Sequence, residues 1–251
     1  GVIGVAVSIG VSLATNDISN EVLAFIQSSQ VTTTAGNLTV QAYEAASITS
    51  RATAASAAAS AGLFSASVAG GGASSVNTIT TITRAYVASS ILNIGGNITI
   101  YAQDVSTAST SVLTANYATG LISMAAGGSV ATVTINTTTE AYLTASTVQD
   151  AGNILISARA TPKGEAFAAG VNAGTLAVGV SKATATLTPT VRASAGGTIN
   201  ADNLTVIATE AVPASGYSAV AEAFGSTGGL IGVDVTDTSV VNNSTVSGFI
   251  D

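Results

Sequence analysis

The chain has 251 residues and a formal net charge of −7, and only 8% of its residues are charged, against about 25% in ordinary soluble domains. The six basic residues form no cluster, so nucleic-acid binding is not expected, and the lack of cysteine excludes disulfides. Mean hydropathy is +0.55. The longest uncharged stretches, Ala52–Thr83 and Val105–Thr139, nevertheless consist mainly of Ala, Ser, Gly and Thr, so no membrane span is predicted.

Three short blocks recur along the chain in a fixed order, each returning after about 56 residues. The first opens on glycine: Gly1-Val2-Ile3, Gly62-Leu63-Phe64, Gly120-Leu121-Ile122, Gly174-Thr175-Leu176 and Gly229-Leu230-Ile231. The second is Ala24-Phe25-Ile26, Ala85-Tyr86-Val87, Ala141-Tyr142-Leu143 and a divergent Pro189-Thr190-Val191. The third is Gly36-Asn37-Leu38, Gly96-Asn97-Ile98, Gly152-Asn153-Ile154 and Asp202-Asn203-Leu204. We therefore predict one continuous repeat array over residues 1–251, a fragment of a longer chain, with units that start near residues 1, 62, 120, 174 and 229.

Alternation of apolar and small or polar residues predicts strands between these blocks. Val133 and Ile135 alternate with threonines, and the segment from Leu176 to Val180 follows the same pattern. The Ala-rich segment 52–61 has helical propensity, but the corresponding segment of the next unit carries Ser, Thr and Val, which favours a strand there too.

The expected fold class is therefore all-β, as a β-solenoid (β-helix-like) built from repeat units of about 56 residues. Each unit forms either one large coil or three small ones; the lack of a shorter period favours the large coil. In a large coil Asn97 and Asn153 would lie one strand spacing apart, about 4.8 Å, and in small coils about three times farther.

The recurrent asparagines Asn37, Asn97, Asn153 and Asn203 are predicted to form a structural ladder at a turn, because Asn tolerates left-handed turns and stacked amides hydrogen-bond along the axis. The glycosylation acceptor pattern leaves a glycan as the alternative; it begins at Asn37, Asn97, Asn136, Asn203, Asn242 and Asn243.

Phe25, Tyr86 and Tyr142 share one repeat position and predict a stacked aromatic ladder, or a sugar-binding stripe if the rings face solvent. Two residues before the aromatic position stand Arg84 in one unit and Glu140 in the next. If the units stack directly, these two side chains would pair across coils.

No catalytic residue, metal site or cofactor site is predicted. Without His or Cys the familiar triads and thiol chemistry are not possible, and the chain is not expected to be an enzyme. Seven residues after each repeat asparagine stand Glu44, Asp104, Ala160 and Glu210, which we interpret as outward, solvated positions rather than a calcium row. Thr-rich segments at 78–83 and 137–139 leave an ice-binding face as an alternative.

The Gly-Asn-Ile-Thr-Ile, Ala-Tyr-Val and Gly-Leu-Ile blocks, with Ser, Thr and Ala between them, resemble the repeat regions of giant secreted bacterial surface proteins. These are the filamentous-haemagglutinin-like and leukotoxin-type filamentous adhesins. The resemblance covers essentially the whole chain but includes no functional motif. It implies an extracellular or cell-surface filament or stalk, non-catalytic, made by one giant chain or by self-association of many. A carbohydrate- or ice-binding solenoid module is the alternative, with cell-surface or matrix carbohydrate as partner, and an outer-membrane β-barrel is a third.

Overall fold

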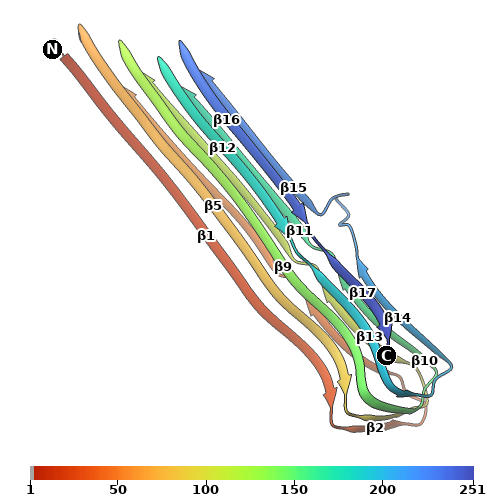
Figure 1. Ribbon diagram of the computed structural model, residues 1–251. Helices are drawn as coiled ribbons and strands as arrows, with labels where there is room; N and C mark the ends of the chain where they lie inside the picture. The colour runs from red at the N-terminus through yellow and green to blue at the C-terminus, as the bar shows by residue number, and fades with distance from the viewer. Residues whose placement is uncertain (1–2) are drawn as a thin grey trace.

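The computed structural model describes residues 3–251, and over these residues every regular element is a β-strand (Figure 1). The first two residues of the Gly1-Val2-Ile3 block lie outside the described part. None of the described residues forms a helix long and apolar enough to cross a membrane. The all-β prediction is confirmed, and the stacked parallel sheets are compatible with a β-solenoid.

The strands form three parallel sheets. The first sheet, sheet A, has nine strands: β1 (Ile3–Gln27), β5 (Phe64–Ala88), β9 (Ile122–Asp150), β12 (Leu176–Leu187), β16 (Ile231–Asn242), β13 (Thr190–Ile199), β17 (Thr245–Ile250), β2 (Gln30–Thr33) and β6 (Ile91–Ile94). Sheet B contains β3 (Leu38–Glu44), β7 (Ile98–Asp104), β10 (Asn153–Ala160) and β14 (Asn203–Glu210). Sheet C contains β4 (Ser47–Ala59), β8 (Thr107–Thr119), β11 (Lys163–Ala173) and β15 (Ala219–Gly228).

Each passage of the chain through the three sheets makes one long, flattened coil. The chain runs down sheet A, turns, and returns through sheet B and then sheet C to the edge where it began (Figure 1). There it turns again and enters the next strand of sheet A. We call this second turn, between the end of sheet C and the start of sheet A, the apolar edge, and the opposite turn before sheet B the corner.

Successive coils pair directly, residue on residue. Ile3 pairs with Phe64 at the start of β1, and Tyr86 pairs with Tyr142 on β5 and β9. In sheet B, Ile154 pairs with Ile98 on one side and with Leu204 on the other. The offsets between bonded partners are 61, 56 and 52 residues in consecutive coils of sheet A.

Three of the sequence blocks do not pair in the register that their repeat positions predict; one is the Gly174 block, in which Leu176 pairs with Met124 rather than with Ile122. The Gly120 block is displaced, because Ile122 pairs with Ala66 rather than with Phe64. The displacement is by two residues, an even number, so inward and outward faces are preserved. The divergent Pro189-Thr190-Val191 block was aligned wrongly: Tyr142 pairs with Ser194, and Thr190 pairs with Thr138.

The space between the layers changes in character from the corner to the apolar edge. Near the corner, sheets A and B bury large aliphatic side chains such as Leu92, Ile100 and Ile156. Toward the apolar edge, sheets A and C are separated mainly by alanines, and the last cluster contains only Ala58, Ala69, Ala118 and Ala125 with Ala6 beside it. Small side chains bring the two layers close together there, which makes the coil thin at this edge.

Candidate functional site

The four predicted turn asparagines form a continuous hydrogen-bonded column at the corner. The backbone N–H of Asn97 donates to Oδ1 of Asn37 at 2.8 Å, and that of Asn153 donates to Oδ1 of Asn97 at 2.8 Å. The Asn203 side-chain amide donates to Oδ1 of Asn153, also at 2.8 Å. Each asparagine thus bonds directly to the next coil's asparagine, as the one-strand spacing requires.

The glycines that precede Asn97 and Asn153 have a steric reason. A Cβ at Gly96 would lie 2.5 Å from Oδ1 of Asn37, and one at Gly152 would lie 2.8 Å from Oδ1 of Asn97. At Gly36 the nearest atom would be Thr33 Cβ, at an ordinary 3.6 Å. The Gly-Asn pair therefore gives the previous coil's amide room to accept its hydrogen bond.

A second column, of serines, lies beside the first and is not apparent from the sequence blocks. The N–H of Ser29 donates to Oγ of Ser90, and the N–H of Ser90 donates to Oγ of Ser146, both at 3.1 Å. Directly before them, Ser28, Ser89 and Ala145 have positive φ, between 47° and 50°. In the sequence the serines of this column share only their repeat position, two residues after Gln27, Ala88 and Thr144. That signal is too weak to identify the column.

The aromatic side chains stack along the same axis. The rings of Phe25 and Tyr86 have centroids 5.2 Å apart and an interplanar angle of 9°, and those of Tyr86 and Tyr142 lie 4.8 Å apart at 7°. The column ends at Ser194, which pairs with Tyr142. Phe25 is 54% exposed. Because each ring covers its neighbour's face, a sugar could meet only the ring edges and the two end faces of the column, on Phe25 and on Tyr142.

Arg84 and Glu140 make a charge pair between coils. Nε of Arg84 lies 2.6 Å from Oε2 of Glu140, and Nη1 lies 3.5 Å from Oε1 of Glu21. The pKa of Arg84 is raised, first by its hydrogen bond to Glu140, with burial acting in the opposite direction. The pair joins the second and third coils on the outer face of sheet A.

We expect little stability from this pair. Because both side chains are partly exposed, Glu140→Gln should lower the free energy of unfolding by about 0–1 kcal/mol, and less at high salt, where exposed charges are screened. Denaturant unfolding at low and high ionic strength measures the effect. A loss above about 2 kcal/mol that persists in high salt would mean that the pair is held by burial instead.

The interpretation of Glu44 and Asp104 as solvated is wrong. Asp104 is fully buried and Glu44 is 8% exposed, and Ala160 in the same row is also buried. The reason is parity: Asp104 lies six residues after the buried Ile98 in one strand, so both side chains point inward. Oδ2 of Asp104 accepts a hydrogen bond from Thr81 at 2.7 Å, and Oδ1 accepts one from the N–H of Ser106 at 3.0 Å.

The threonine segments are divided between the two faces. Thr81, Thr83, Thr137 and Thr139 are buried, whereas Thr78 and Thr134, which pair with each other, lie on the outer face of sheet A. The outer threonine row is therefore sparser than the sequence indicates. Among residues 3–251 no group of three or more acidic side chains is placed to hold a metal ion.

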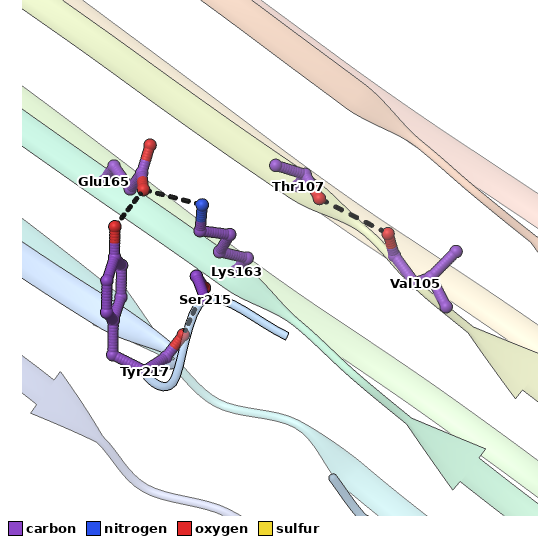
Figure 2. A network of polar contacts seen from close by, with 6 residues as sticks. All are labelled: Val105, Thr107, Lys163, Glu165, Ser215 and Tyr217. Atoms are coloured by element: carbon purple, nitrogen blue, oxygen red, sulfur yellow. Dashed lines mark hydrogen bonds and ion pairs between the residues drawn. The ribbon is translucent and has the colours of Figure 1, made fainter. Parts of the chain in front are cut away.

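The longest irregular connection carries a polar cluster that sequence reasoning missed. Between β14 and β15, the segment 211–218 leaves the stack and returns at Tyr217 (Figure 1). The Tyr217 hydroxyl donates to Oε1 of Glu165 at 2.7 Å, and Nζ of Lys163 lies 2.7 Å from the same oxygen (Figure 2). The Lys163 ammonium is also 5.2 Å from the Tyr217 ring centroid.

This cluster borders a surface groove of about 230 Å³, lined in part by Ser109, Glu165, Phe167, Tyr217 and Glu222. The sequence offered only a loop signal here, Pro213 followed by Gly216, and Gly216 has a φ of +85°. Loops on a rigid scaffold are where binding residues are usually found. Aromatic rings beside carboxylates make this groove a candidate site for a small polar ligand.

The cluster should hold the loop between the lowered pKa of Glu165 and the raised pKa values of Lys163 and Tyr217. The pKa of Glu165 is lowered, first by its hydrogen bond from Lys163 and then by that from Tyr217. Its contribution is present above the unfolded pKa, about 4.3, and is lost as pH falls through the lower folded value. The pKa values of Lys163 and Tyr217 are raised by Glu165, so their contributions are lost only as pH rises through those values.

We therefore expect the NMR signals of the Tyr217 ring to titrate with an apparent pKa below about 4.3. The Glu165→Gln variant should abolish that acid titration while the ring signals of Tyr142, in the aromatic column, stay unchanged. A Tyr217 titration that survives the substitution would show that another carboxylate holds the loop.

No protein-family model, no curated protein and no solved structure matches the chain.

Proposed function

We propose that the chain is a section of a structural shaft: a β-solenoid of repeat units of about 56 residues, part of an extracellular filament or stalk of an adhesin-like surface protein. The observation that carries the proposal is the direct residue-on-residue pairing of consecutive coils in all three sheets. Backbone hydrogen bonds then run along the axis through every coil. At each junction between two coils, a load along the shaft is shared by all the hydrogen bonds of that junction.

The side-chain columns support a mechanical role. Asparagine, serine and aromatic columns all run along the same axis, and each repeats one contact from coil to coil. Such columns contribute register rather than chemistry, because a slip by one residue would break all of them together and turn buried side chains outward. The resemblance of the three sequence blocks to the repeat regions of filamentous adhesins is our reason for proposing an extracellular setting.

Imaging tests the shaft. Negative-stain micrographs of the assembly should show thin rods of constant width, because open strand edges at both ends of a stack favour end-to-end addition. The length of rods should increase with protein concentration if many subunits assemble, and should stay fixed if one chain makes the whole shaft. Compact particles without an elongated axis, over the whole concentration range, would contradict the proposal.

A carbohydrate-binding module is the second candidate, and the groove beside Tyr217 favours it. Phe167 and Tyr217 would offer ring surface to a sugar, and Glu165 and Glu222 would offer hydrogen-bond acceptors to its hydroxyls. Titration with a panel of oligosaccharides tests this. Binding should be lost in Phe167→Ala and retained in Tyr142→Ala, and the absence of binding to any sugar in the panel would set this candidate aside.

A further inference from the structure

The apolar edge differs in charge from the rest of the molecule. On sheet A no charged side chain precedes Asp17 in β1 or Arg84 in β5 within the described residues. On sheet C, β4 contains no charged residue after Arg51, and β8 contains none at all. Within the edge, the exception is Asp234, whose two carboxylate oxygens are buried. Apart from Asp234 in the last coil, the coils therefore present an uncharged end.

Most outward side chains at this edge are apolar, on both faces and at three of the four turns; the fourth turn carries Thr175. On β1 the outward residues Ile3, Val5, Val7, Ile9, Val11 and Leu13 are between 66% and 76% exposed. On sheet C, Tyr117, Val171 and Phe224 are 56%, 53% and 55% exposed. The turns carry Leu63, Leu121 and Leu230 at 76%, 65% and 87% exposure, where an ordinary surface turn carries polar residues.

Several backbone donors of these turns have hydrogen-bond partners within the protein. The N–H of Leu121 donates to Oγ of Ser65 and that of Thr175 donates to Oγ of Ser123, both at 2.8 Å. The N–H of Ser60 bonds to the carbonyl of Thr119 at 3.0 Å. Satisfied donors of this kind are what an apolar solvent demands of exposed backbone.

The depth of the apolar edge matches one leaflet of a bilayer. The outward charges of sheet A that lie nearest to the apolar edge are Lys182 and Asp237, which pair at 3.0 Å. Each lies six residues after the first residue of its strand. On sheet C, Glu222 stands six residues before the end of β15. At about 3.3 Å per residue these charges lie about 20 Å from the turn, against about 15 Å of hydrocarbon in one leaflet.

We propose that the apolar edge inserts into the outer half of a lipid bilayer, with the shaft axis parallel to the membrane plane and each coil adding one wedge. Lys182, Asp237 and Glu222 then lie at the level of the lipid headgroups. A second copy of the chain is a poorer occupant, because a partner sheet would cover one face and leave the other face and the leucine turns in water. With a net charge of −7 and no basic residue at the edge, insertion is driven by apolar burial, so neutral lipid suffices.

The lack of tryptophan in the chain makes the test direct. A Leu121→Trp variant should show blue-shifted fluorescence on neutral phosphatidylcholine vesicles and quenching by brominated acyl chains. A matched Leu155→Trp variant, on the outer face of sheet B, should show neither. Vesicles that also contain an anionic phospholipid should bind no more strongly than neutral ones.

A charge variant tests the surface itself. Leu63→Asp, Leu121→Asp and Leu230→Asp together should weaken vesicle co-flotation at least tenfold. The same added charge at exposed positions far from the edge, Thr39→Asp, Thr144→Asp and Thr205→Asp, should change it less than twofold.

The inference is overturned if the unmodified chain does not float with neutral vesicles, or if both triple variants lose binding equally. It is also overturned if sedimentation shows a dimer that the leucine variant abolishes while vesicles bind neither protein, because the edge would then be an interface between copies. None of these outcomes affects the rods expected in micrographs, so this inference and the shaft proposal fail separately.

Discussion

Gly127→Ala should be among the most damaging single substitutions in the chain, although it adds only one methyl group. A Cβ at Gly127 would overlap the side-chain amide of Asn116 and would lie 2.7 Å from Oδ1 of Asn172. These two asparagines belong to an interior column in which Ser56 donates to Asn116 at 2.6 Å and Asn116 donates to Asn172 at 2.9 Å. The new methyl would overpack the interior and push at least one of these bonds out of line. We expect a loss of about 2–4 kcal/mol in the free energy of unfolding.

The neighbouring glycine is the matched control. At Gly128 the side chain would point outward, and a Cβ would meet only the carbonyl of Val180 at 3.7 Å. Neither glycine has positive φ, so alanine is compatible with both backbones. Gly128→Ala should leave stability unchanged or raise it by up to about 1 kcal/mol, because alanine reduces the entropy of the unfolded chain. Denaturant titrations of the two variants measure the difference; equal losses would mean that the Asn column does not occupy the space above Gly127.

The corner asparagine column could be predicted from the sequence, but the interior asparagine column could not. The repeats predicted the corner column of Asn37, Asn97, Asn153 and Asn203, because those residues share one spacing and one local block. Asn116 and Asn172 belong to no shared sequence block, and their role depends on the glycines of sheet A opposite them. That relation joins residues across the two layers, and no local pattern records it.

For the carboxylate row, the sequence predicted the repeat position but not the direction of the side chains. The row of Glu44, Asp104 and Glu210 was found from the spacing, but its direction depends on the parity of the strand from the buried Ile98 to Asp104. Charge alone favoured the outward face. The buried hydrogen bonds that make the inward position tolerable come from Thr81 on sheet A and from the N–H of Ser106, two residues after Asp104. The cluster at Tyr217 was missed because Lys163 and Glu165 lie on β11, whereas Tyr217 lies in the loop before β15 of the next coil.

Ile156→Ala should be comparably damaging, for the opposite reason, since it removes volume from the most apolar part of the interior. Ile156 is fully buried on β10, where it pairs with Ile100 of the previous coil and Val206 of the next. These aliphatic neighbours are held by backbone bonds on both sides and cannot collapse into the cavity. We expect a loss of about 2–5 kcal/mol.

The adjacent residue on the same strand separates this packing effect from any effect on the strand itself. Leu155 points to the other face and is 36% exposed, so Leu155→Ala changes the same backbone neighbourhood but leaves no interior cavity. Its cost should stay below about 1 kcal/mol. Unfolding of both variants by denaturant measures the two losses, and they should differ at least twofold. If Leu155→Ala costs as much as Ile156→Ala, the outer face of sheet B is itself covered, and the shaft must then pack laterally against another surface through that face.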